Sequence, residues 1–271
     1  MSRQAGTREN SDKILAIDRR ARIMEMVKRN HSVLIGDLTK EFGVSAVTAR
    51  SDLNILEKEG KLKRMYGGAV SLGLARHVSV PRERMVVNID QKRRIAVEAA
   101  KLIHNGDVIA IDTGSTTLEF AKQLANKQDI TVVTNDFAIA EYIERNLLDI
   151  DLVVLGGTFR REHRYTYGQL TLSTIQTLHF DKAFMGTNAF LANQGFMTEY
   201  EPEASIKVNL MNHANTSYLL MDSSKVNANG FIQFAKLSEF SAIIMDADPN
   251  GIVKDALNRA NTSTELMLAN D

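Results

Sequence analysis

The chain beyond residue 90 alternates short apolar runs with stretches of helical periodicity. An amphipathic stretch from Gln91 to Ile103 precedes the first run. Six runs then follow in order: DVIAID, DITVVT, DLVVLG, DKAFMG, SYLLMD and SAIIMD. Continuous apolar runs of this length are typical of strands buried on both faces of a parallel sheet. Because strands that alternate with helices form such sheets through right-handed crossovers, the pattern predicts an α/β domain over residues 91–271.

The N-terminal part has a different pattern, which predicts three helices and a hairpin. Helical spacing runs from Arg19 to Asn30 and from Ile35 to Phe42, and glycines follow the second and third predicted helices. Ser45 can cap the third helix, which should extend to about Glu59. The basic segment KLKRMYGGAV then suits a hairpin. We therefore expect four parts: a flexible tail (1–17), a helical domain (18–72), a linker (73–90) and the α/β domain (91–271).

Composition narrows the class of protein. The chain of 271 residues has no net charge and no cysteine. Residues 1–76 nevertheless carry 15 Lys and Arg against 9 Asp and Glu, and the remainder carries 18 against 24. A basic part within a neutral chain is what a polyanion-binding domain would show. No signal-peptide core and no membrane-length apolar run is present, so we expect a cytoplasmic protein without disulfides or a membrane partner.

The predicted third helix has an apolar face and a polar face. Ala49, Leu53 and Leu56 fall together on a helical wheel. The opposite side presents small polar groups, an amide and cations that could enter a major groove, with Val47 positioned for a thymine methyl. By itself such a face is more typical of a solvated helix in an ordinary helical bundle. The candidate DNA-binding residues of the helix and the basic hairpin are Ser45, Val47, Thr48, Arg50, Ser51, Asn54, Lys63, Arg64 and Tyr66.

Several predicted strands of the α/β domain end in polar or glycine residues. The first strand runs into Asp112 and the turn TGSTT, whose backbone N–H groups could hold an anion at the start of a helix. A helix simply capped by Ser115 or Thr116 is the alternative. Ligands of open α/β sheets bind beyond the carboxyl ends of the strands, so these turns could converge on one pocket. The other candidate turns are Thr134-Asn135, Gly156-Gly157, Gly186 with Asn188, and Asp222 to Lys225.

The N-terminal sequence resembles the DeoR family of bacterial sugar-metabolism regulators. The resemblance is carried by VSAVTARSDLNILEKEGKLKRMYGGAV, and Arg19, Ile23 and Val27 match the preceding helix. It implies a winged helix-turn-helix, with the basic hairpin as the wing. Ser51 departs from the Lys, Arg or Asn that the family usually has there, which bears on the operator sequence. A regional similarity to repressors of amino-sugar use, such as N-acetylgalactosamine catabolism, also extends over VSAVTARSDL and YGQLTLSTIQTLHFDKAFMG.

The C-terminal half is similar to the family's sensor domain, a Rossmann-like fold related to ribose-5-phosphate isomerase and glucosamine-6-phosphate deaminase. This similarity implies that the DTGSTT turn holds the phosphate of a sugar phosphate. It also implies that Asp181, Glu203 and Lys225 lie near the sugar. Pro202 departs from the acidic residue common before the matching glutamate. The candidate effector-binding residues are Asp112, Gly114, Ser115, Thr116, Thr117, Thr134, Asn135, Gly156, Gly157, Tyr167, Asp181, Glu203, Lys207, Asp222 and Lys225.

The sequence as a whole predicts a DNA-binding regulator. We expect a repressor of a sugar operon, controlled by a phosphorylated sugar and acting as a homodimer or homotetramer on operator DNA. The alternative is a sugar-phosphate isomerase or deaminase with an added DNA-binding domain, since Asp112, Asp181 and Glu203 could serve acid–base chemistry. The histidines are scattered and no nucleotide-binding P-loop occurs, so neither a metal nor a cofactor is predicted. The run Arg160 to Arg164 could meet DNA or phosphate, but it is interpreted as a solvated loop or a subunit contact.

Overall fold

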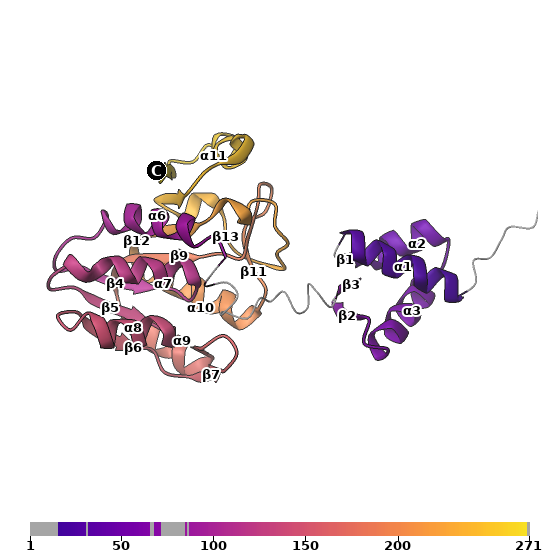
Figure 1. Cartoon of the computed structure of the whole chain (residues 1–271), viewed down its shortest axis with the longest axis horizontal. Coiled ribbons are helices and arrows are strands. Elements are labelled where there is room, and N and C mark those ends of the chain that lie inside the picture. Colours follow the sequence, from indigo (N-terminus) through magenta and orange to yellow (C-terminus); the bar gives the residue numbers. More distant parts are fainter. Residues whose placement is uncertain (1–15, 31, 66–67, 72–84, 86, 270–271) are drawn as a thin grey trace, which may run out of the picture. The chain divides into compact units, whose positions relative to one another are not determined.

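The computed structural model describes residues 16–30, 32–65, 68–71, 85 and 87–269. The chain divides into two compact units, Met1–Ser79 and Val80–Asp271 (Figure 1). No helix among the described residues is long and apolar enough to cross a membrane.

The first unit contains three helices and a small antiparallel sheet. Its elements are α1 (Ala16–Asn30), β1 (Ser32–Leu34), α2 (Ile35–Phe42), α3 (Ala46–Lys58), β2 (Leu62–Met65) and β3 (Gly68–Ser71). The helices and the hairpin agree with the sequence prediction, although α1 begins at Ala16, inside the predicted tail. Strand β1 was not predicted, because three residues are too few to show a period; it pairs with β3 in the order β1-β3-β2. Ile23, Leu38 and Leu53 belong to the core that these elements share.

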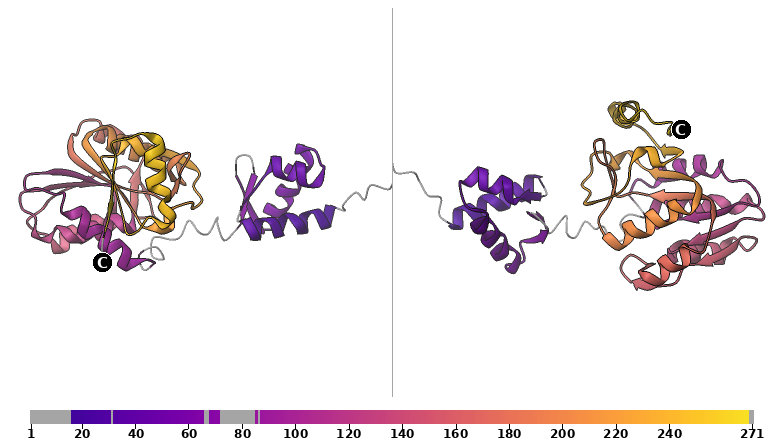
Figure 2. Two further views of the ribbon diagram at one scale, coloured as in Figure 1. Left: turned by 90° about the horizontal axis from the view of Figure 1, so that it is seen from above. Right: turned by 180° about the vertical axis from the view of Figure 1, so that it is seen from behind.

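The second unit is built on a seven-stranded parallel sheet in the order β15-β14-β12-β9-β4-β5-β6. Its strands are β4 (Val108–Ile111), β5 (Thr131–Thr134), β6 (Asp151–Val154), β9 (Phe180–Gly186), β12 (Ala214–Met221), β14 (Ala242–Met245) and β15 (Glu265–Leu268). The first six correspond to the six predicted strands. The strand β15 was not predicted. Figure 2 shows the twist of this sheet from two further directions.

Helices cover both faces of the sheet. One face packs against α6 (Ile89–Ala100), α7 (Ser115–Ala121) and α8 (Phe137–Asn146), and the other against α9 (Gln169–Ile175), α10 (Glu201–Asn212) and α11 (Ile252–Ala260). Successive strand residues alternate between the two cores: Ile243 and Met245 belong to one and Ile244 to the other. This alternation is why the strands read as continuous apolar runs. The helix predicted from Gln91 begins at Ile89, inside the predicted linker.

Shorter elements complete the unit. A hairpin of β7 (Thr158–Arg160) and β8 (Tyr165–Tyr167) follows β6, and a second sheet has the order β10-β11-β13. The remaining elements are β10 (Ala189–Leu191), β11 (Gly195–Thr198), β13 (Ile232–Ala235) and the 3-10 helices η1 (Lys122–Asn126), η2 (Ser223–Lys225), η3 (Leu237–Glu239) and η4 (Pro249–Gly251).

One strand departs from the expected burial. The run DLVVLG was predicted to be buried on both faces, but β6 is the last strand of the sheet. Val153 and Val154 are 39% and 42% exposed. An apolar run indicates a strand but does not fix its place in the sheet, and only a central place buries both faces.

Candidate functional site

Helix α3 presents the polar face that the sequence predicted. Ala49, Leu53 and Leu56 are buried, while Arg50, Ser51 and Asn54 are exposed. Val47 is 73% exposed. A contact with DNA would explain why such a large apolar side chain faces solvent here. Ser45 is the N-cap, and its Oγ accepts a hydrogen bond from the Thr48 N–H at 3.2 Å.

A buried ion pair holds α1 against α3. The Asp52 carboxylate accepts hydrogen bonds from Arg19 Nε at 2.6 Å and from an Arg20 guanidinium nitrogen at 3.4 Å. Asp52 is only 3% exposed, so these arginines compensate its charge. Arg19 and Asp52 both match the pattern of the DeoR family, but their contact was not predicted. The signal that could have predicted this contact was the acidic Asp52 next to the apolar face of α3.

The hairpin is joined to the exposed face of α3. Arg64 donates from its guanidinium to Asn54 Oδ1, and its backbone N–H donates to Glu57 Oε1 at 2.8 Å. The Asn54 amide oxygen is therefore engaged by the wing residue, which connects the two predicted DNA-binding elements. Tyr66 and the side chain of Lys63 lie outside the described residues, so their predicted roles stay predictions.

A pocket lies at the carboxyl ends of β4, β5 and β9 and surrounds the turn between β4 and α7. Helix α7 begins at Ser115 after Gly114, whose φ of +151° favours glycine. Neither Ser115 nor Thr116 caps the helix, which removes the alternative interpretation of the turn. The N–H groups at the start of a helix have no partner within it, so this turn offers donors to an anion. The lining residues are Met85, Thr113, Gly114, Ser115, Thr116, Thr117, Leu118, Asp136, Ala138, His163, Arg164, Tyr165, Gly186, Thr187, Asn188, Glu203 and Lys225.

Asp136 fixes this turn and was missed in the sequence. Its Oδ2 accepts hydrogen bonds from Thr113 Oγ1 at 2.7 Å and from the Gly114 N–H at 3.3 Å. Its Oδ1 caps α8 through the N–H groups of Ala138 and Ile139. Burial raises the pKa of the Asp136 carboxyl, against the lowering effect of these hydrogen bonds. Its position directly after Thr134-Asn135 was the signal that could have found it.

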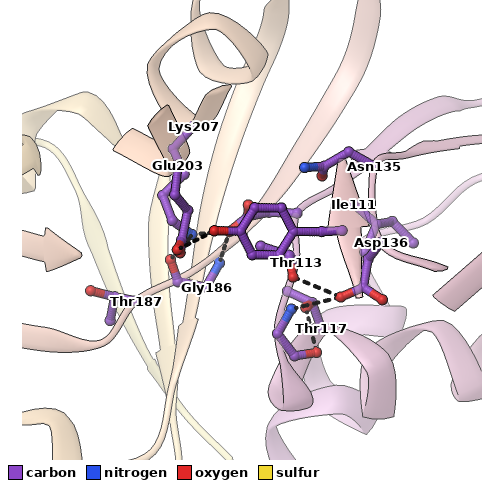
Figure 3. A network of polar contacts seen from close by, with 12 residues as sticks. Ile111, Thr113, Thr117, Asn135, Asp136, Gly186, Thr187, Glu203 and Lys207 are labelled. Carbon is purple, nitrogen blue, oxygen red and sulfur yellow. Dashed lines mark hydrogen bonds and ion pairs between the residues drawn. The ribbon is translucent and has the colours of Figure 1, made fainter. Parts of the chain in front are cut away.

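A buried network lies beside the pocket (Figure 3). Lys207 Nζ forms an ion pair with Asp112 and lies 3.6 Å from Glu203 Oε1. Asp112 Oδ2 also accepts the Gly186 N–H at 2.9 Å, and burial raises the pKa of this carboxyl although the Lys207 charge lowers it. Asp112 Oδ1 is buried and accepts no hydrogen bond from the described residues. Asp112 and Lys207 do not line the pocket themselves, whereas Glu203 does, so the predicted residues Asp112 and Lys207 lie behind its wall.

The β7–β8 hairpin extends the network to the pocket wall. The Tyr165 hydroxyl donates to Glu203 Oε2 at 3.2 Å and accepts from an Arg160 guanidinium nitrogen at 2.6 Å. Burial raises the pKa of Tyr165. The Arg160 guanidinium carbon lies 4.1 Å from the centroid of the Tyr200 ring. The basic run interpreted as a solvated loop or subunit contact thus supplies His163 and Arg164 to the pocket lining.

Asp181 does not lie at the pocket, contrary to the prediction that it lies near the sugar. It stands near the beginning of β9, whereas Gly186 at the end of β9 lines the pocket. Asp181 Oδ2 accepts the N–H of Val108, the first residue of β4, at 2.8 Å. Because a strand rises about 3.3 Å per residue, Asp181 lies roughly 16 Å from the pocket end.

Four other predicted residues support the pocket from outside its lining. Thr134 Oγ1 donates to the Ile111 carbonyl oxygen and Asn135 Nδ2 donates to the Thr166 carbonyl oxygen. Tyr167 packs edge-on against the rings of Tyr165 and Tyr200. Asp222 caps η2 and accepts a hydrogen bond from Asn88 Nδ2 at 3.0 Å. Within the segment Asp222 to Lys225, Lys225 is the residue that lines the pocket.

The turn Gly156-Gly157 also lies outside the lining. A Cβ on Gly157 would come within 2.2 Å of Thr171 Oγ1, and Thr171 Oγ1 donates to the Gly156 carbonyl oxygen at 2.7 Å. Gly157 therefore permits close packing against α9, whereas a Cβ on Gly156 would meet no atom within 4 Å. Among the described residues no group of three His, Asp or Glu is arranged as a metal site.

Comparison with known proteins assigns both units. The DeoR-like helix-turn-helix domain matches residues 19–73, and the DeoR C-terminal sensor domain matches residues 87–247. The HTH-type transcriptional regulator GlpR of Haloferax volcanii is 32% identical over 250 residues, covering 92% of this chain and 97% of that protein. A putative aga operon transcriptional repressor of Escherichia coli O157:H7 is 31% identical, covering 89% and 88%.

One further relative gives the same assignment. The HTH-type transcriptional repressor GlcR of Bacillus subtilis is 30% identical, covering 89% of this chain and 93% of that protein. Among solved structures, ribose-5-phosphate isomerase A of Methanocaldococcus jannaschii aligns at 23% identity and a TM-score of 0.38, over 51% of this chain and 55% of that one. With both of its domains matched and relatives aligned over nearly their whole length, the chain belongs to the DeoR family of transcriptional regulators.

Proposed function

We propose that the protein represses a sugar-catabolic operon and that a phosphorylated sugar in the pocket of the second unit controls its binding to operator DNA. The observation that carries the proposal is the pocket itself, where the uncapped start of α7 lies beside a buried network of acidic and basic side chains. Repressor relatives that match this chain along its length support the same function.

The pocket offers complementary groups for the two ends of a sugar phosphate. The N–H groups of Ser115, Thr116 and Thr117 would hold the phosphate, because they point from the positive end of the helix. The side chains of Lys225 and Arg164 add positive charge to the lining. The Glu203 carboxylate in the lining would accept hydrogen bonds from sugar hydroxyls, and the buried Lys207–Asp112 pair behind it would fix its position and compensate its charge.

The first unit would bind DNA through α3 and the hairpin. Ser51 and Asn54 would enter the major groove, with the Asn54 amide oxygen held by Arg64, whereas Arg50 at the side of this face would hold a phosphate. Paired copies would bind repeated or palindromic half-sites, because the symmetry of a dimer is mirrored in its operator. The effector would change DNA affinity only if it prefers one arrangement of the protein.

An enzyme with the same pocket is the competing function. A regulator binds its effector unchanged, whereas an isomerase or deaminase converts it. We propose binding without turnover, because the related proteins over the whole length are regulators.

The test is an operator-shift titration with the DNA upstream of the protein's own gene, at fixed salt, with a panel of sugar phosphates that includes amino-sugar phosphates. We expect a shift that one sugar phosphate releases, with that compound recovered intact. Consumption of a sugar phosphate without any DNA shift would favour the enzyme.

A glycine pair supplies the matched control for the pocket. Gly114→Ala strains the turn at a φ of +151° and brings a Cβ within 3.3 Å of Thr117 Oγ1. Gly106→Ala is strained at a φ of +89°, with no atom within 4 Å of the added Cβ. Each change should cost about 1 kcal/mol of stability. Only the Gly114 variant should lose the response to the sugar phosphate while it keeps its DNA affinity.

A further inference from the structure

The chain enters the second unit through a short segment that reaches the pocket. We call Met85, Val87 and Asn88 the entry segment; the whole first unit precedes them in the sequence. Met85 is half-buried, lines the pocket and packs against the core that contains Ile95 of α6. A molecule bound in the pocket would therefore lie against the part of the chain that leads back to the DNA-binding unit.

Asn88 holds the entry segment with a side chain that does not cap its own helix. It precedes α6 in the left-handed conformation, with φ of +54° and ψ of +37°, which asparagine tolerates better than most residues. An asparagine in this position usually accepts a hydrogen bond from the first turn of its helix, but Asn88 makes no such bond to the described residues of α6. Its Nδ2 donates instead to Asp222 Oδ1 at 3.0 Å. The side chain therefore ties the entry segment to a distant element.

Asp222 joins this hydrogen bond to the pocket. Asp222 is only 1% exposed, and its Oδ1 also accepts hydrogen bonds from the Ser224 N–H at 3.1 Å and from the Ser224 hydroxyl. Ser224 belongs to η2, and Lys225, the last residue of η2, lines the pocket. One carboxylate thus holds both the entry segment and the turn that brings Lys225 to the pocket.

The hydrogen bonding of Asp222 is one-sided. Its Oδ1 accepts from both Asn88 and Ser224, whereas its Oδ2 is buried and accepts no hydrogen bond from the described part of the chain. A buried acceptor without a partner costs free energy, which lowers the cost of any rearrangement that brings Oδ2 a donor. This contact is therefore better suited to a switch than to a permanent anchor.

A second hydrogen bond fixes the entry segment to a different element. The buried Lys92 of α6 donates from Nζ to the Val87 carbonyl oxygen at 2.6 Å. Val87 is thus anchored on α6 and Asn88 on η2, so a displacement of η2 relative to α6 acts on the backbone between them. A phosphate at the start of α7 would attract the Lys225 ammonium and supply such a displacement.

We propose that the hydrogen bond between Asn88 and Asp222 couples the pocket to the DNA-binding unit, with a sugar phosphate drawing Lys225 and η2 and so shifting the entry segment. Asn88 and Asp222 are then positioning residues, which act through Lys225 and do not contact the effector. The coupling rests on the proposed function, since it needs an effector in the pocket. An amide donor on a buried carboxylate is strong enough for about a 10-fold effect on binding, within the usual range of coupling between two sites.

The test replaces Asn88 by residues that keep its backbone conformation. Asn88→Gly removes the donor without backbone strain, because glycine adopts the left-handed conformation freely. Asn88→Asp keeps the shape of the side chain but sets a second carboxylate against Asp222. The matched control is Asn261→Gly at the end of α11, where an exposed left-handed asparagine with φ of +47° and ψ of +48° lies outside the pocket lining.

Each full-length variant is titrated with operator DNA in a shift assay, with and without ribose 5-phosphate, glucosamine 6-phosphate or galactosamine 6-phosphate. Calorimetry measures the binding of the same compounds. The quantity compared is the ratio of the operator Kd with and without the compound that releases the wild type. We expect this ratio to fall about 10-fold, or to 1 if the wild-type ratio is smaller, in both Asn88 variants, which still bind operator and sugar phosphate. The ratio should be unchanged in Asn261→Gly.

The outcomes separate the coupling from the proposed function. A full response of a folded Asn88 variant, or equal losses in Asn88→Gly and Asn261→Gly, would refute the coupling and leave the proposed function standing. Loss of sugar-phosphate binding by the Asn88 variants would make Asn88 a binding residue and would also refute the coupling. A wild type that none of the three compounds releases or binds would overturn the proposed function, and the coupling with it.

Discussion

The buried network beside the pocket gives the sharpest quantitative prediction. Lys207→Met keeps the length and most of the volume of the side chain but removes the charge that compensates Asp112 and Glu203. Lys207 and Asp112 are 1% and 0% exposed. Breaking a buried ion pair by removing one partner costs about 3–5 kcal/mol, because the other charge stays buried and unpaired. For a unit of this size we expect Tm to fall by roughly 10 °C.

The loss should depend on pH in a definite direction. Burial raises the pKa of Asp112, and the Lys207 ammonium opposes that rise, so removing the ammonium raises the pKa further. A carboxyl whose folded pKa lies above its unfolded value stabilises the fold below the unfolded pKa, and this contribution is lost as pH rises through the folded pKa. The deficit of the variant in free energy of unfolding should therefore be smallest in acid and grow towards neutral pH.

The assay is urea unfolding followed by circular dichroism between about pH 5 and pH 8. Lys182→Met is the matched control, since Lys182 pairs with Asp107 at 2.6 Å with side chains 14% and 12% exposed. Although desolvation opposes it, the Lys182 hydrogen bond and the His104 N–H hold the pKa of Asp107 below its usual value. The control deficit should thus be about 1 kcal/mol and constant over this range. A Lys207→Met deficit below that of the control, or one independent of pH, would refute the reasoning.

Three further predictions concern the two binding surfaces. Asp52→Ala leaves two arginines without their carboxylate and should destabilise the first unit by about 2 kcal/mol, which urea unfolding followed by circular dichroism should detect. Arg50→Ala should weaken operator binding at least 10-fold in a DNA-shift assay and leave effector affinity intact, with Arg145→Ala as the control of equal charge, whereas Asp112→Ala should do the reverse. Asp136→Ala removes the α8 cap and frees the turn, so calorimetry should show effector affinity reduced at least 10-fold and stability reduced by about 1 kcal/mol. Equal damage by Arg50→Ala and Asp112→Ala to both activities, in folded protein, would contradict separate binding surfaces.

The sequence alone determined a large part of the local structure, although not the short strands such as β1 or the last strand β15. Periodicity located α2 at Ile35–Phe42 and the six predicted strands of the sheet, and Ser45 was identified as the cap of α3. The position of the TGSTT turn followed as well, because a polar turn after a buried strand is a local signal. Each of these features depends on residues within one or two turns of one another, so a single sequence contains the necessary information.

The tertiary structure decided which side chains meet. Lys207 reaches Asp112 across 95 residues, and Tyr165 reaches Glu203 across 38, and no local pattern records such distances. The structure placed Asp181 at the opposite end of the sheet and put Asp136 beneath the turn. Strand order made β6 an exposed edge, although its sequence is as apolar as that of the central strands. Local periodicity fixes what each element is. Long-range pairing of the strands fixes which ends and edges lie together, and the position of the candidate pocket depends on that pairing.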